Sequence, residues 1–427
     1  MRTSSLFAAL AATLLTAGLA RAQTPAEEEI RRLAQHPDVQ RALAVIERQD
    51  DLTMADLREL TQIPAPPFAE EARGRRFLDK LREIGVDSAW VDEEGNVIGL
   101  RRGTGGGETV AVAGHLDTVF PEGTDVTIRA RGDTLYAPGI GDDTRGLAAV
   151  LALLRALNEA GVRSEADILF IGNVGEEGLG DLRGVKHLFR PDGPGIDAFI
   201  SIDGTGHEGL THQGLGSHRY RITFRGPGGH SWGAFGLANP AHALGRAILH
   251  FQEAADRLTR SGPRTSYNVG VIGGGTSVNS VPFEAWAEVD LRSESPASLE
   301  RVDAALQAAV ARALDEENAL KRRGEALTVA VDMIGDRPSG ELPVETPIVQ
   351  RGVAASRHLG IEPRLGRGST DANIPISMGI PAVTIGGGGV AGGAHSLNEW
   401  FLNRGGPLGI QRALLILLAQ AGVAPAS

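Results

Sequence analysis

Between residues 216 and 338 the predicted strands and helices follow a different order from those on either side, and this change constrains the fold most. The apolar spacing in this segment predicts strands over 217–225, 267–272, 285–292 and 326–333, and helices over 241–258 and 296–323. The resulting order, β-α-β-β-α-β, is that of a ferredoxin-like unit. We therefore predict a self-contained α+β domain over residues 216–338.

On both sides of this segment, strands alternate with helices, which predicts a three-layer α/β domain. The predicted strands are 109–113, 166–174, 198–203 and 381–385, and the predicted helices include 146–160, 344–359 and 408–422. The α/β domain would span residues 23–215 and 339–427. The fold class is therefore α/β, with the α+β domain inserted into it.

The first 22 residues have the composition of a targeting segment. Arg2 precedes an apolar run over 6–19, and small residues at Ala20 and Ala22 flank Arg21. This pattern is typical of a signal peptide cleaved after Ala22, and the run is short for an uncleaved membrane anchor. We expect a secreted, periplasmic protein whose mature form has no membrane segment.

Composition excludes several classes of function. Asp and Glu total 53 against 42 Lys and Arg, which argues against a nucleic-acid partner. The chain has no cysteine, so disulfides, cysteine-bound zinc and thiol catalysis are ruled out.

Histidines and carboxylates gather where predicted strands end and in glycine-rich loops. The residues are His115 and Asp117, Asp142 and Asp143, Glu176 and Glu177, Asp203, and His395 with Glu399. Open α/β sheets bind ligands outside the carboxyl ends of their strands. Imidazole and carboxylate together are the ligands expected for Zn²⁺, Co²⁺ or Mn²⁺.

These motifs, in this order, resemble the M20 metallopeptidase family of zinc aminoacylases, carboxypeptidases and tripeptidases. The resemblance rests on Gly114-His115-Leu116-Asp117-Thr118-Val119, Gly139-Ile140-Gly141-Asp142-Asp143, Glu176-Glu177-Gly178, Ile202-Asp203-Gly204, Gly229-His230-Ser231, Asn279-Ser280-Val281-Pro282, Asp290-Leu291-Arg292, Gly368-Ser369-Thr370-Asp371-Ala372-Asn373 and Ala394-His395-Ser396. It implies a di-zinc catalytic domain and an inserted lid and dimerisation domain, and hence a homodimer.

The resemblance also implies two divalent metal ions, zinc or alternatively cobalt or manganese. His115 and Asp203 would bind one ion, Glu177 and His395 the other, and Asp142 would bridge both. Relatives often carry Lys or Met-Lys after the bridging acid, whereas this chain has Asp143-Thr144-Arg145. Asp143 therefore remains an alternative to Asp142.

Further roles follow from the same resemblance. Asp117 would orient His115, and Glu176 would act as general base toward a metal-bridging hydroxide. His230 would stabilise the oxyanion, often from the partner subunit. The implied substrate contacts are Asn279 and Arg292 for a carboxylate, with Ser369 and Thr370 along the substrate backbone.

Asp203 bears on the substrate. In the resembling family, Asp at this position accompanies aminopeptidases and dipeptidases, and Glu accompanies carboxypeptidases and deacylases. We therefore expect hydrolysis of di- or tripeptides with a free N-terminus. The alternative is an N-acyl-amino-acid deacylase or carboxypeptidase acting on an acylated amino acid or peptide.

Two other classes of function are alternatives to a metallopeptidase. Gly229-His230-Ser231-Trp232-Gly233 satisfies the G-x-S-x-G pattern of serine hydrolases, with Asp371 and His395 downstream. A serine hydrolase of this kind would leave Glu176, Glu177 and His115 without a role. A non-catalytic peptide-binding protein with this fold would lack one of the metal ligands or the general base. This chain has all five ligand residues and Glu176. His207, His212 and His218 match no motif but follow a predicted strand end closely.

Overall fold

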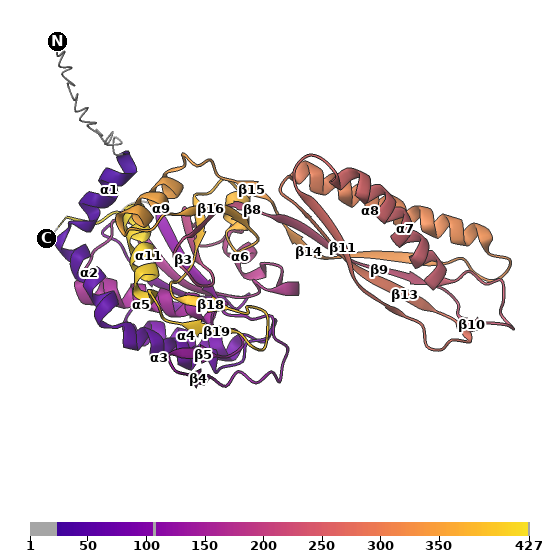
Figure 1. Ribbon diagram of the computed structural model, residues 1–427, viewed down its shortest axis with the longest axis horizontal. Helices are drawn as coiled ribbons and strands as arrows, with labels where there is room; N and C mark the ends of the chain where they lie inside the picture. Colours follow the sequence, from indigo (N-terminus) through magenta and orange to yellow (C-terminus); the bar gives the residue numbers. More distant parts are fainter. Residues whose placement is uncertain (1–23, 106–107, 426–427) are drawn as a thin grey trace, which may run out of the picture.

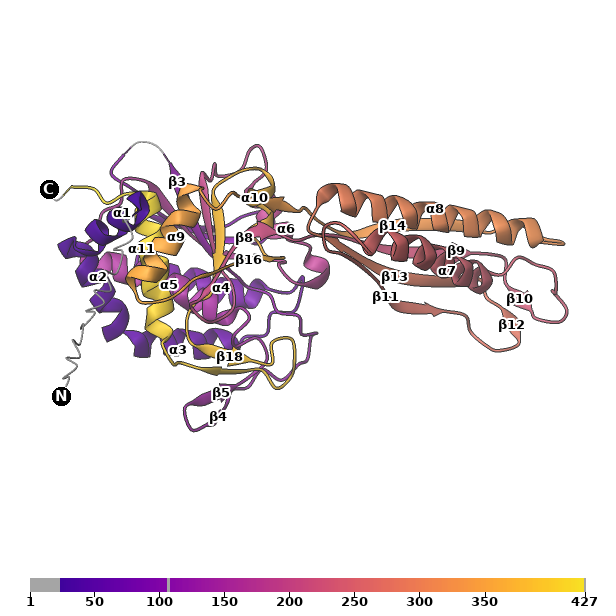
Figure 2. The same cartoon turned by 45° about the horizontal axis from the view of Figure 1, so that its top comes forward.

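The computed structural model describes residues 24–105 and 108–425. The predicted signal peptide lies outside the described residues. The chain forms two lobes, a large rounded one and an elongated one that projects from it (Figures 1 and 2). No helix in the described ranges is long and apolar enough to cross a membrane.

A nine-stranded sheet runs through the large lobe in the order β1-β2-β6-β3-β7-β17-β8-β15, with β16 paired to β8. Its strands are β1 (Ser88–Val91), β2 (Val97–Arg101), β3 (Thr109–His115), β6 (Asp167–Asn173), β7 (Ala198–Ile202), β8 (Gly209–Gly214), β15 (Gly340–Glu341), β16 (Arg364–Gly368) and β17 (Ala382–Ile385). The four central strands β6, β3, β7 and β17 are parallel. Nearly all of their residues are buried, as in parallel sheets covered on both faces.

The helices of the large lobe come from both the N-terminal and the C-terminal part of the described residues, which lie side by side (Figure 1). They are α1 (Pro25–Ala34), α2 (Pro37–Arg48), α3 (Asp50–Thr61), α4 (Glu71–Ile84), α5 (Thr144–Ala160), α6 (Arg183–Leu188), α9 (Pro347–His358), α10 (Asn373–Ser377) and α11 (Gly406–Ala421). Helices α5 and α11 pack against β3, and α4 packs against β1 and β2. The core contains residues from before and after the inserted segment, so neither part folds this sheet alone.

A small second sheet, β18-β19-β5-β4, lies beside the large one. Its strands are β4 (Arg129–Arg131), β5 (Thr134–Tyr136), β18 (Val390–Gly392) and β19 (Trp400–Leu402). The sequence did not predict these strands, because three residues are too few to show an alternating pattern. The sheet joins the loop before α5 to the loop that carries His395.

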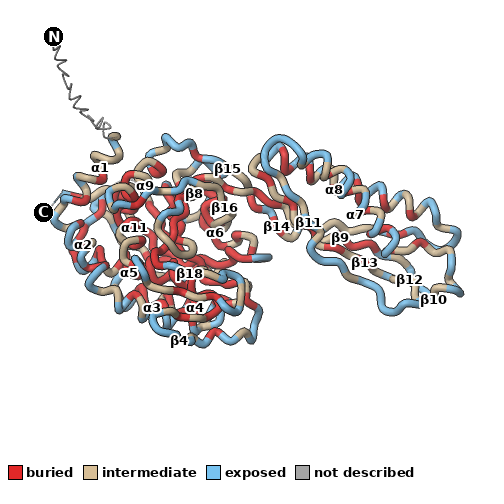
Figure 3. The backbone as a smooth tube through the Cα atoms, viewed as in Figure 1, coloured by how far each residue is buried: buried red, intermediate tan, exposed pale blue. Residues whose placement is uncertain are grey.

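The elongated lobe is a four-stranded antiparallel sheet in the order β11-β13-β9-β14. Its main elements are β9 (Gly216–Arg225), α7 (Pro240–Thr259), β11 (Thr265–Gly274), β13 (Glu284–Ser293), α8 (Pro296–Leu320) and β14 (Thr328–Arg337). Every second residue of β13 is buried, which places one sheet face against α7 and α8 and leaves the other open. Figure 3 shows this separate strip of buried residues.

This arrangement confirms the predicted fold class: an α/β domain with an inserted ferredoxin-like unit. Strand β9 begins at Gly216 and β14 ends at Arg337. The domain boundaries, and the use of the inserted unit as a lid or dimerisation domain, stay predictions. A short pair, β10 (Gly229–His230) and β12 (Ser280–Val281), forms the far tip of the lobe.

Helix α8 ends earlier than predicted, at Leu320 rather than Arg323. The backbone N–H groups of Arg322 and Arg323 both donate to the carbonyl of Gly236 in the tip loop. These hydrogen bonds replace the helical ones, so a long-range contact ends the helix before Gly324.

Candidate metal centre

The predicted ligands meet at one edge of the large sheet. His115 is the last residue of β3, Asp203 directly follows β7, and Glu176 and Glu177 lie three and four residues after β6. Because β6, β3 and β7 are adjacent and parallel, their carboxyl ends lie together. The loops before α5 and after β18 add Asp142 and His395 to this edge.

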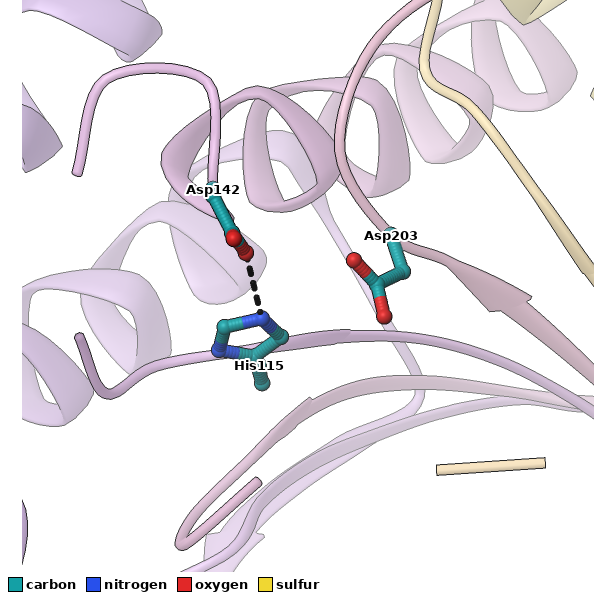
Figure 4. Close-up of side chains that lie close together, drawn as sticks. All are labelled: His115, Asp142 and Asp203. Carbon is teal, nitrogen blue, oxygen red and sulfur yellow. Dashed lines mark hydrogen bonds and ion pairs between the residues drawn. The ribbon is translucent and has the colours of Figure 1, made fainter. Parts of the chain in front are cut away.

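Asp142 lies between the two histidines. Its Oδ1 is 3.1 Å from Nε2 of His115, and its Oδ2 is 3.2 Å from Nε2 of His395. The same His395 nitrogen is 3.0 Å from Oε1 of Glu177. Figure 4 shows Asp142 against the His115 ring and Asp203 directed toward the same space.

Two groups of ligand atoms share the Asp142 carboxylate. One consists of His115, Asp142 and Asp203, and the other of Asp142, Glu177 and His395; within each group the atoms lie within 4.8 Å of one another. Each group combines one imidazole with two carboxylates, a donor set that suits Zn²⁺, Co²⁺ or Mn²⁺. A third group, His115 with Glu176 and Glu177, lies within the same limit.

The carboxylates of the cluster are buried close to one another. Burial and the neighbouring charge of Asp142 raise the pKa of Asp203 to about 7. Burial likewise raises the pKa of Glu176 well above its usual range, although Arg337 opposes the shift. A divalent cation would offset this crowding of negative charge, so the arrangement fits a metal centre.

Asp143 takes a structural position. Its carboxylate accepts hydrogen bonds from the backbone N–H groups of His115, Gly146 and Gly204, at 3.1, 3.1 and 2.9 Å. It thereby caps the N-terminus of α5. A Cβ at Gly146 would lie 2.3 Å from the Asp143 carboxylate, so the cap requires glycine there. Of the two neighbouring acids, the structure places Asp142 in the cluster.

Asp117 contacts more than the histidine that it was predicted to orient. Nδ1 of His115 lies 3.0 Å from the Asp117 backbone carbonyl and 3.7 Å from its carboxylate. The Asp117 carboxylate accepts the backbone N–H groups of Glu176 and Glu177, at 3.0 and 2.8 Å. This buried side chain therefore fixes the loop that carries both glutamates.

Glu176 forms a buried ion pair that sequence reasoning missed. Nη1 of Arg337 donates to Oε1 of Glu176 at 3.0 Å and to Oγ of Ser369 at 3.1 Å, and Nη2 donates to the Glu176 carbonyl. Arg337 ends β14, so it reaches the cluster from the inserted unit. The only sequence signal for Arg337 is its position next to Pro338, where the order of strands and helices returns to that of the α/β domain.

Glu399 also had no assigned role in the sequence. Its carboxylate accepts the backbone N–H groups of Gly139, Gly141 and Asp142, at 2.8, 2.7 and 3.0 Å. Glu399 follows His395 by four residues, so one short segment supplies a histidine and fixes the loop that presents Asp142.

The predicted substrate contacts fall in three places. Ser369 hydrogen bonds to Arg337 beside the cluster, and the Thr370 hydroxyl lies 2.7 Å from that of Thr384. Arg292 lies near the large lobe, paired with Ser217 at the start of β9. His230 and Asn279 lie together at the far tip, where Ser231 donates to the Asn279 carbonyl. Within one chain, Asn279 and Arg292 are therefore not neighbours.

The remaining candidates lie outside the cluster. Ser231 belongs to the tip, whereas Asp371 is buried in the large lobe and accepts a hydrogen bond from Asn173, so no Ser231 triad forms within the chain. His212 contacts the carbonyl of Leu342, and His218 pairs with Asp303 at 2.6 Å. The carbonyl of His207 accepts from Arg412.

Comparison with known proteins adds to this geometry. Residues 111–418 match the family model of peptidase family M20/M25/M40. The chain belongs to this family. The predicted resemblance is thereby confirmed, and this M20 chain carries its candidate metal ligands within the matched span.

Relatives of this M20 chain differ in their named activities. Carboxypeptidase G2 of Pseudomonas sp. strain RS-16 is 29% identical over 335 residues, which are 73% of this chain and 75% of that protein. A relative from Pyrococcus abyssi, named as a LysW-lysine/LysW-ornithine hydrolase, is 34% identical over 40% of this chain and 45% of its own length. The chain thus matches less than half of that protein.

Solved structures share the fold of this M20 chain. Aminopeptidase PepT from Bacillus cereus aligns with a TM-score of 0.68 at 23% identity, covering 87% of this chain and 98% of that one. The fold is therefore shared with that aminopeptidase structure over nearly its full length.

Proposed function

We propose that this chain hydrolyses amide bonds in small peptides, using two divalent metal ions that share Asp142. His115 and Asp203 would complete one site, and Glu177 and His395 the other. The observation that carries the proposal is the position of the Asp142 carboxylate, with one oxygen toward each histidine.

Zinc suits the imidazole and carboxylate ligands, with cobalt or manganese as alternatives. When bound, such ions would supply Lewis-acid chemistry, polarising the scissile carbonyl and lowering the pKa of a water molecule. Glu399 and Asp117 hold the backbone of the ligand loops, so the protein presents the ligands in a fixed arrangement.

Glu176 is the general base of this proposal. It belongs to neither of the two groups that share Asp142, and Arg337 holds its Oε1, leaving Oε2 for the proton. Burial raises its pKa, so the ionised carboxylate is a stronger base toward the attacking water than an exposed glutamate. The same carboxyl group would then protonate the leaving amine.

His230 would stabilise the oxyanion. Its Nδ1 accepts hydrogen bonds from the backbone N–H groups of Trp232 and Gly233, both at 3.2 Å. In the neutral ring the proton therefore resides on Nε2, which can donate to a developing oxyanion.

A second copy of the chain would bring His230 to the centre. The tip that carries His230 lies at the opposite end of the inserted unit from the chain's own metal ligands (Figures 1 and 2). Trp232 and Phe235 beside it are 88% and 68% exposed, an apolar surface typical of an interface. We infer a homodimer through the inserted unit, which light scattering of the purified protein would test.

For the substrate, we favour di- or tripeptides with a free N-terminus, because Asp203 occupies the family position that accompanies aminopeptidases and dipeptidases. Carboxypeptidase G2, the relative matched over 73% of the chain, supports the alternative of a carboxypeptidase or deacylase. The two alternatives differ in which end of the peptide must be free.

One experiment separates them. The metal-loaded protein is incubated with a tripeptide, its N-acetylated form and its C-amidated form, and the products are identified by mass. Release of the first residue, blocked by acetylation, supports the proposal. Release of the last residue, or faster cleavage of the acetylated peptide, supports the alternative, and no cleavage of any peptide refutes both.

We also propose that the mature protein is secreted and begins at Gln23. N-terminal sequencing of protein from the periplasmic fraction of a bacterial host would test this. A chain that keeps residues 1–22, or remains in the cytoplasm, would contradict it.

A further inference from the structure

Residues 175–181 form a tight loop after β6, the glutamate loop, which carries Glu176 and Glu177. The backbone N–H of Gly180 donates to the carbonyl of Glu177 at 2.8 Å. A Cβ at Gly180 would lie 2.5 Å from the Cα of Gly175, so the two ends of the loop touch. Close-packed segments transmit strain, so a contact anywhere on this loop bears on the position of Glu177.

Arg219 of the inserted unit reaches the glutamate loop. Its Nη1 donates to the carbonyl of Gly178 at 2.6 Å, one residue after Glu177. Its Nε donates to Asp290, the residue opposite it on β13, at 3.0 Å. The guanidinium is thus fixed on the inserted sheet while it holds the loop of the large lobe. Asp290 also accepts Nε of Arg292 at 2.8 Å, so this acid keeps a partner when Arg219 is replaced.

The neighbouring strand makes a second contact with the same loop. The backbone N–H of Asp336 on β14 donates to the Asp181 carboxylate, at 2.9 and 3.0 Å from its two oxygens. Gly335 lies opposite Arg219, and a Cβ there would lie 3.1 Å from Cδ of Arg219 and 3.3 Å from Oδ1 of Asp181. The inserted unit therefore holds the glutamate loop at two adjacent points.

The position of Glu177 decides one of the two metal sites. Its Oε1 lies 3.0 Å from Nε2 of His395 in the group that shares Asp142. The large lobe holds the backbone N–H of Glu177 through the Asp117 carboxylate, whereas the inserted unit holds the carbonyl one residue later. Groups that orient a ligand without touching the metal typically change metal affinity by about 10- to 100-fold.

We propose that Arg219 is a positioning residue for the metal site that Glu177 and His395 complete. It acts from the inserted unit through the backbone of the glutamate loop. His115 and Asp203 follow central strands of the large lobe, so the site that they complete does not depend on Arg219. The inference rests on the proposed metal centre and adds to it a residue of the inserted unit.

Variants with one metal site each test this dependence. Asp203→Asn leaves the site of Glu177 and His395, and Glu177→Gln leaves the site of His115 and Asp203. Zinc affinity of the metal-free proteins is measured by calorimetry, with and without Arg219→Ala. We expect Arg219→Ala to weaken zinc binding about tenfold in the Asp203→Asn background and to leave it unchanged in the Glu177→Gln background.

Arg221→Ala is the matched control. Arg221 lies two residues along β9 on the same face, where it pairs with Glu288 at 2.8 Å and lies over the Trp286 ring. Both contacts lie within the inserted sheet, so this substitution removes a similar cross-strand ion pair and should leave zinc affinity unchanged. Arg219→Lys should restore part of the lost affinity, because it keeps a charged donor but not the planar fork.

The two-metal enzyme gives a second measurement. The zinc concentration for half-maximal activity should rise about tenfold with Arg219→Ala and stay at the parent value with Arg221→Ala. Excess zinc should restore most of the activity that Arg219→Ala loses. If Asp203→Asn binds no zinc, this titration decides the inference alone.

The outcomes separate the inference from the proposed function. Unchanged zinc affinity in the Asp203→Asn background, or an unchanged zinc requirement of the two-metal enzyme, would overturn the role of Arg219. An equal loss of affinity in both backgrounds would overturn it as well, because it would show a general loosening of the fold. A parent protein that binds no zinc would instead refute the proposed metal centre.

Discussion

Arg337 and Glu176 form a buried ion pair 3.0 Å long between the last residue of β14 and the loop after β6. The pair joins the inserted unit to the proposed base, and both side chains are at least nine-tenths buried. Removing one partner of such a pair leaves an uncompensated charge, which is strongly destabilising.

Arg337→Ala should therefore lower kcat by about 10²-fold, because a base displaced by about 1 Å loses its alignment with the water. Arg337→Lys should recover part of this loss, since it restores the charge but not the two-pronged contact. Steady-state kinetics and metal content are measured together. A fall in metal content that accounts for the whole loss would contradict a positioning role.

The adjacent glutamates should give opposite phenotypes. Glu176→Gln should keep its metal and lose about 10²–10⁴-fold in kcat, since it removes the base. Glu177→Gln should lose metal affinity, because it weakens the group formed with Asp142 and His395. Metal analysis of both purified variants, followed by kinetics at saturating zinc, checks the assignment. Exchanged phenotypes would show that the two roles are reversed.

Mixing two inactive variants should restore activity if His230 acts on the partner's centre. His230→Ala keeps Glu176, and Glu176→Gln keeps His230, so each mixed dimer holds one complete site. Random exchange in an equal mixture then restores about a quarter of the parent activity. Subunit exchange is verified by mass spectrometry of the native dimers. No recovery despite exchange would mean that each chain supplies its own His230.

Chelation should lower stability as well as activity. Asp203, Glu176 and Glu177 all have raised pKa values, and burial is the first cause in each case. A bound cation stabilises the folded state by an amount that rises with the logarithm of its concentration relative to Kd, about 2.7 kcal/mol at 100 times Kd. We expect the Tm to fall with a chelator and to recover with zinc. A Tm indifferent to chelator and zinc would argue against a metal centre.

The sequence predicted the residues of the metal cluster, but not the residues whose hydrogen bonds hold that cluster in place. His115, Asp203 and Glu177 follow strands whose apolar runs are visible in the sequence, so the strand-end rule locates them. Arg337 and Glu399 act through contacts 161 and 257 to 260 residues away in the chain. No local pattern reports such contacts. The same holds for the separation of Asn279 from Arg292, which depends on the length of the inserted sheet.

The inserted unit is joined to the large lobe at one end only. Ser217, at its start, pairs with Arg337, at its finish, so the entering and leaving strands run side by side. A rigid rotation of the unit would therefore turn about this strand pair. Strand β9 has ten residues, a length of about 33 Å, so a rotation of about 10° there would carry the far end through about 6 Å. Because Arg337 lies at this strand pair, such a rotation would displace His230 at the far end while moving the base beside Arg337 very little.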